Sequence, residues 1–161
     1  MKKLLILLVT IIGFGISANA QNTLTFYGWG VGANTPDGRS GYGHVFISIN
    51  GEFWGFGRNE WKVRHVWASG GMHGDLSTYA TVKISFEINS SQYTRVIQKI
   101  NKWVEDEPDY ITGNNDCTTF AMEIADAADI GYGSRWSIQS PIGFLERLKD
   151  YNPKATRFWN H

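Results

Sequence analysis

Residues 41–57 read GYGHVFISINGEFWGFG, and this stretch decides the expected fold. β-branched and aromatic residues stand on both sides of Asn50-Gly51, which is the strongest short sequence signal for a two-residue hairpin turn. The stretch therefore predicts two antiparallel strands, one from His44 to Ile49 and one from Glu52 to Gly57.

The turn also predicts which side chains share a face of the hairpin. If Ile49 pairs with Glu52, Asn59 becomes the diagonal neighbour of His44, within reach of its side chain. An amide in that place could hold an imidazole in one tautomer. A register slip of one residue would reverse the faces. The predicted face of His44 carries Phe46, Ser48, Phe53, Gly55, Gly57 and Asn59.

The remaining elements follow from periodicity and from turn residues. We expect further strands at Thr23–Trp29, Tyr79–Ile88 and Ala155–Trp159. We also expect three helices: one capped by Ser90 or Ser91, one from about Cys117 to Ala128, and one with Ser140 as its cap and Pro141 as its first residue. Strands come first and helices later, which predicts an α+β fold with an antiparallel sheet. Residues 21–161 are long enough for one domain with a core of its own.

The first twenty residues have the three-part form of a secretory signal peptide. Lys2 and Lys3 give a positive start, residues 4–16 are mostly apolar, and Ala18-Asn19-Ala20 offers a cleavage site. The apolar run is short for a membrane span. We therefore expect cleavage before Gln21, a periplasmic or secreted protein, and no stable membrane insertion afterwards.

The charge pattern argues against a nucleic-acid partner. The chain has 15 Lys+Arg and 15 Asp+Glu. Two lysines and no acidic residues lie in the first twenty residues. Residues 21–161 therefore contain 13 Lys+Arg and 15 Asp+Glu, a net charge of −2. No basic run is present, and the aromatic residues are not interleaved with lysine or arginine.

Cys117 is the only cysteine in the chain. Turn-forming residues precede it and a helical apolar pattern follows, so the thiol is expected in the first turn of a helix, where the helix dipole lowers a thiol pKa. A lone cysteine in an exported protein is a buried hydrophobic residue, an intermolecular linker or a reactive thiol. Its place at a helix start favours the reactive thiol.

The sequence GHVFISINGEFWGFG at residues 43–57, followed by NNDCTTFA at 114–121, resembles the circularly permuted papain-like fold. That group includes permuted relatives of the NlpC-type cell-wall peptidases and the lecithin–retinol acyltransferase-like proteins. The resemblance implies Cys117 as nucleophile and His44 as base. The chain departs from the family pattern in two ways, and these bear on the identity of the third catalytic residue and of the substrate. The return strand has no second histidine, and Asp116 separates Asn115 from Cys117.

The expected function is that of an exported thiol hydrolase, an amidase or peptidase. Cys117 would attack an amide carbonyl, His44 would take and return the proton, and Asn59 would orient the imidazole. Resemblance and export together point to peptidoglycan peptide as substrate. A lipid acyltransferase or thioesterase and a non-catalytic binding module remain as alternatives. No cofactor or metal is expected, because the spacing of His65, His73 and Asp75 matches no common zinc pattern.

Overall fold

The computed structural model describes residues 21–35, 38–39, 41, 43–57, 64–65, 76–106, 108–135 and 140–159. The expected signal peptide and three residues weighed above, Asn59, His73 and Asp75, lie outside these ranges. The described strands are β1 (Asn22–Trp29), β2 (Asn34–Thr35), β3 (Gly38–Arg39), β4 (His44–Ile49), β5 (Glu52–Gly55), β6 (Arg64–His65), β7 (Val82–Ile88) and β8 (Thr156–Trp159). The described helices are the 3₁₀ helix η1 (Leu76–Tyr79), α1 (Ser90–Asp106), α2 (Cys117–Ala127) and α3 (Pro141–Tyr151).

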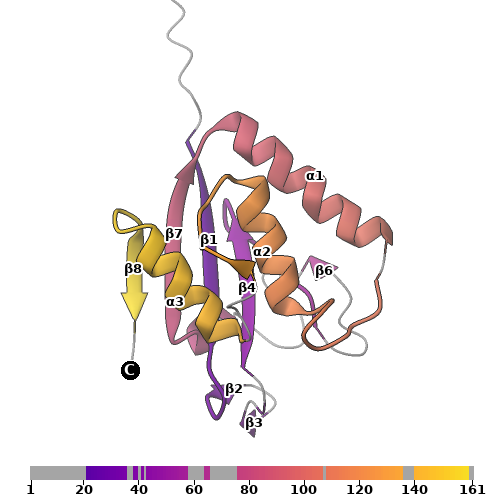
Figure 1. Ribbon diagram of the computed structural model, residues 1–161, viewed down its shortest axis with the longest axis vertical. Coiled ribbons are helices and arrows are strands. Elements are labelled where there is room, and N and C mark those ends of the chain that lie inside the picture. The colour runs from indigo at the N-terminus through magenta and orange to yellow at the C-terminus, as the bar shows by residue number, and fades with distance from the viewer. Residues whose placement is uncertain are drawn as a thin grey trace, which may run out of the picture.

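Six strands form one sheet in the order β6-β5-β4-β1-β7-β8 (Figure 1). Every neighbouring pair in it is antiparallel. Helices α2 and α3 lie across one face, and α1 packs beside α2. The predicted α+β class with an antiparallel sheet is confirmed. Within the described part of the chain, no helix is long and apolar enough to cross a membrane.

The hairpin between β4 and β5 has the predicted register. Ile49 pairs with Glu52, Ser48 with Phe53 and Ile47 with Trp54. Asn50 and Gly51 have φ angles of 51° and 88°, so both turn residues occupy the left-handed region that a type I′ turn requires. Asparagine and glycine are the residues that accept this region most readily, and for this reason the dipeptide fixes the register.

The helix starts are set by side-chain caps. Ser140 Oγ accepts the N–H of Gly143 at 3.0 Å, and Pro141 is the first residue of α3, as predicted. The start of α1 differs from the expectation by one residue. Asn89 caps it in place of Ser90 or Ser91, because its Oδ1 accepts the N–H of Gln92 while Gln92 Oε1 accepts the N–H of Asn89. This reciprocal pair is a capping box.

Both faces of the central strands are buried. On the helix side, Phe26 and Ile47 join Phe120 and Leu145 in the main core. On the opposite face, which we call the aromatic face, the side chains of Tyr27, Trp29 and Phe46 form a second cluster, with Phe53, Ala33 and Ala80 packed against it. Side chains alternate along a strand, so successive residues of β4 belong to different clusters.

Candidate functional site around Cys117

The start of α2 is fixed by the carboxylate of Asp116. It accepts the N–H groups of Thr118 and Thr119 at 3.0 and 2.9 Å, and that of Gly113 at 2.7 Å. Gly113 has a φ of 83°, which lets the chain turn back on itself just before the helix. Asp116 therefore serves as the N-cap, and Cys117 is the first residue of α2, as predicted.

The thiol of Cys117 lies inside the protein, where only 4% of the residue is exposed. Hydrogen bonding from the backbone of Val45 and from the side chains of Tyr110 and Thr118 lowers the pKa of the thiol and so favours the thiolate. Burial nevertheless raises the pKa of the Cys117 thiol, and the charge of Asp116 adds to the rise. The direction is opposite to that expected from the helix dipole alone, because desolvation of the charged form outweighs the donors.

Tyr110 is a neighbour of the thiol that the sequence did not single out. Its ring packs 5.3 Å from that of Phe56. Hydrogen bonds from Ile111 N to Asn115 O (2.8 Å) and from Asn114 N to Ile111 O (2.9 Å) tie the following turn to the start of α2. Burial raises the pKa of Tyr110 well above its usual range, so the hydroxyl stays protonated and remains a donor. No sequence spacing pointed to it, since the contact arises from this turn.

His44 is the first residue of β4, and its imidazole lies on the aromatic face. The ring is 5.2 Å from that of Trp29 and 5.9 Å from that of Phe46. A Cβ added at Gly55 would be in ordinary van der Waals contact with His44 Nε2, at 3.6 Å, and in tight contact with Phe46 Cβ, at 3.1 Å. Burial lowers the pKa of His44 to about 4, which keeps the imidazole neutral at pH 7.

The structure brings Cys117 to the backbone beside His44 but places the two side chains on opposite faces of the sheet. Val45 and Cys117 belong to the helix-side core, whereas Phe46 and Trp29 belong to the aromatic face. The imidazole stacks with the second group. The expected contact between thiol and imidazole is therefore not made in this conformation. Asn59 is outside the described residues.

A metal site has no support in the described part of the chain. No group of three or more His, Cys, Asp or Glu residues gathers there. Of the three residues considered for zinc, His65 is described only as a backbone position in β6, paired with Trp54. His73 and Asp75 are outside the described ranges.

Comparisons with protein families, with curated proteins and with solved structures find no match for this chain. Function is therefore inferred from the residues and contacts described above.

Proposed function

We propose that this protein is an exported thiol hydrolase with a permuted papain-like fold and that Cys117 is its nucleophile. One observation carries the proposal: α2, whose first residue is Cys117, packs against β4, the strand that begins with His44, and Cys117 and Val45 belong to the same core cluster. A strand with histidine and a helix that begins with cysteine, in this chain order, are what the resemblance implies.

The protonation states fit a general-base mechanism better than a preformed ion pair. At pH 7 the thiol, whose pKa is raised, and the imidazole, whose pKa is lowered, are both neutral. His44 would take the thiol proton as Sγ bonds to the amide carbon, and would pass it to the leaving amine. Water would then hydrolyse the thioester. The Cys117 N–H, in the first turn of α2, would donate to the oxyanion.

This reaction requires a change of backbone conformation at His44, the first residue of β4, because side-chain rotation alone cannot move the imidazole from one face of the sheet to the other. The imidazole must leave its ring contacts with Trp29 and Phe46 and reach the thiol. Within the described residues, no hydrogen bond holds the ring on the aromatic face. Contacts between catalytic groups often tighten only when substrate binds. Export and the resemblance together favour peptidoglycan peptide as the substrate.

A non-catalytic binding module of the same fold is the second candidate. It is favoured by the burial of the thiol and by the position of His44 on the opposite face of the sheet. A lipid acyltransferase or thioesterase would use the same nucleophile. A panel of peptide and ester substrates distinguishes these activities.

The deciding experiment compares hydrolysis of peptidoglycan peptides by the wild type and by variants. Cys117→Ser and His44→Ala should each lower kcat/KM by orders of magnitude, and the double variant should be little worse, because the two groups act as a unit. Asn59→Ala should lower kcat/KM by a smaller factor, because an amide that only orients the imidazole is not essential to the chemistry. Cys117→Ser nearly preserves volume, so thermal unfolding should confirm an intact fold.

Two outcomes would contradict the thiol-hydrolase proposal. If Cys117→Ser keeps wild-type activity on a cleaved substrate, Cys117 is not the nucleophile. If the wild type cleaves neither peptides nor esters, the binding module becomes the better account.

A further inference from the structure

A groove runs between α3 and the edge of the sheet formed by β7 and β8, and the turn after β1 closes one end. Its volume is about 790 Å³, within the size range of small-ligand pockets. We call it the α3 groove and define it by Val31, Ile142, Glu146, Lys149 and Arg157, which are among its lining residues. It opens to solvent on the helix side of the sheet, because Arg157 pairs with Ile84, a residue of the helix-side core.

The sequence of α3 places unlike side chains on two faces of the helix. Phe144, Leu145 and Leu148 are buried in the core. Ile142, Glu146 and Lys149 recur at helical spacing and line the groove. The helix therefore supplies one apolar side chain followed by two charged ones to the wall of the groove.

The groove has a positive balance of charge, whereas residues 21–161 together carry a net charge of −2. Lys149 and Arg157 face one acid, Glu146. Arg157 donates one hydrogen bond, to Pro153 O at 2.8 Å, and a guanidinium has five N–H donors in a planar fork. Such a fork matches the two oxygens of a carboxylate. The apolar part includes Ile142 and Val31, which is 75% exposed.

We propose that the α3 groove binds the carboxyl end of a short peptide with small apolar side chains. The terminal carboxylate is held by the guanidinium of Arg157, with the charge of Lys149 nearby, and the side chains lie against Val31 and Ile142. This binding needs no thiol chemistry, so it stands whether or not Cys117 is catalytic.

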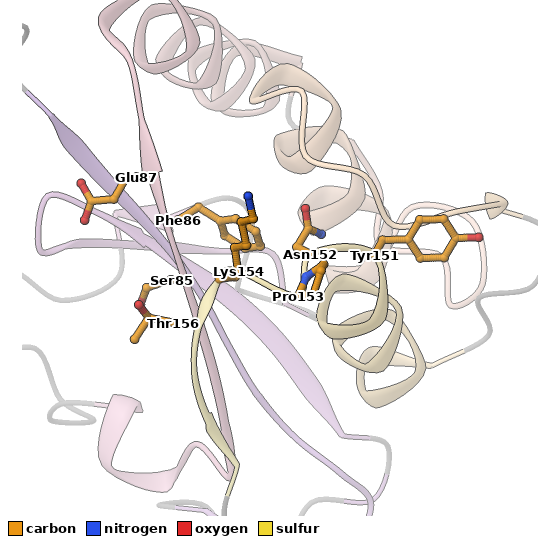
Figure 2. Close-up of a pocket in the computed structure, with 9 residues that line it drawn as sticks. Ser85, Phe86, Glu87, Tyr151, Asn152, Pro153, Lys154 and Thr156 are labelled. Carbon is orange, nitrogen blue, oxygen red and sulfur yellow. The ribbon is translucent and has the colours of Figure 1, made fainter.

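A second groove, at the other end of α3, provides the control. Its volume is about 480 Å³, and it carries one cation, Lys154, and one acid, Glu87. Figure 2 shows that Glu87 and Tyr151 point in opposite directions, away from Phe86 between them. The polar groups of this second groove do not converge on one point, so Lys154 serves as a matched cation outside the proposed site.

The test is calorimetric titration of the Cys117→Ser protein, which cannot cleave through the thiol, with tetra-alanine as free acid and as C-terminal amide. The free acid should bind roughly tenfold or more tightly, the usual effect of a charge-assisted hydrogen bond. Arg157→Gln should remove most of the preference for the free acid over the amide. Lys154→Gln should leave both affinities unchanged.

Val31→Asp adds a negative charge at an exposed position and should weaken binding of the free acid without disturbing the fold. Equal affinity for acid and amide, no binding of either, or an Arg157-dependent affinity for inorganic phosphate alone would each overturn the proposal. If the wild type cleaves peptides and any of these results is also found, peptide binding in the α3 groove is wrong and the thiol-hydrolase proposal is unaffected.

Discussion

At the level of single residues, burial decides the protonation of both candidate catalytic groups. The thiol of Cys117 has three hydrogen-bond donors and a helix N-terminus beside it, yet its pKa is raised. The imidazole of His44 has two aromatic neighbours, and its pKa falls to about 4. Loss of water around a charge therefore outweighs the local dipoles in this part of the protein.

The lowered pKa of His44 predicts a loss of stability in mild acid. The unfolded chain binds a proton near pH 6.5 and the folded protein only near pH 4, so the contribution to stability is complete above pH 6.5 and declines as the pH falls towards 4. Between pH 7 and pH 5 the free energy of unfolding should fall by up to about 2 kcal/mol from this group. Urea unfolding of the wild type and of His44→Phe at pH 7 and pH 5 measures the contribution of His44 to this change. An equal pH dependence in the two proteins would show that His44 is not the source.

At the level of elements, the cap of α2 links stability to thiol chemistry. The Asp116 carboxylate accepts three backbone N–H groups and its charge also raises the pKa of Cys117. Asp116→Ala should lower the free energy of unfolding by about 1–2 kcal/mol, whereas Asp116→Asn should keep most of the cap. Asp116→Asn should also speed alkylation of Cys117 at neutral pH, because a negative charge is removed. A slower alkylation, or equal stability of the Ala and Asn variants, would contradict this role.

The packing of α3 on the sheet depends on Gly28 in β1. A Cβ there would lie 2.6 Å from both the backbone oxygen of His44 and Leu145 Cδ1. Gly28→Ala must therefore shift β4 or α3 and should lower the free energy of unfolding by about 1–3 kcal/mol. Gly131→Ala is the matched control, because a Cβ at Gly131 has no neighbour within 4 Å. Denaturant unfolding of both variants checks the difference, and similar values would mean that the contact relaxes without cost.

The elements also mark how far the sequence could predict the structure. The register of the hairpin, the cap of α3 and the start of α2 follow from local chemistry, because Asn50-Gly51, Ser140-Pro141 and the turn before Cys117 specify their own backbone. Which face of β4 receives the helices is a tertiary property. Val45 and Phe46 are both apolar, so alternation left the two faces equivalent, and the position of His44 relative to Cys117 could not be predicted.

The same limit applies to the surroundings of the thiol. The helix start predicted a lowered thiol pKa, but burial depends on how α2 meets β4 and on the turn that brings Tyr110 to the sulfur. Such contacts join residues far apart in the chain. No periodicity within α2 or β4 specifies them.

At the scale of the whole molecule, the proposed cleavage site lies just before the first described strand. β1 begins at Asn22 and lies between β4 and β7 in the sheet, so cleavage before Gln21 removes none of its residues. We therefore expect the exported protein to begin at Gln21, as N-terminal sequencing of protein recovered from the periplasm or medium would show. Full-length protein retained in the cytoplasm would contradict the export proposal.

The stability of truncated chains tests the same boundary. A chain that begins at Gln21 should unfold at the same denaturant concentration as the full chain, because β1 is complete. Deletion through Thr25 removes the pairing of residues 22–25 with β7 and of residues 24–25 with β4, including the pairs that the fully buried Leu24 makes with Ile49 and Phe86. Since β1 holds the two halves of the sheet together, this shorter chain should show no cooperative transition in circular dichroism. A cooperative transition at the original midpoint would mean that the first half of β1 is dispensable, and the central place of this strand in the core would have to be reconsidered.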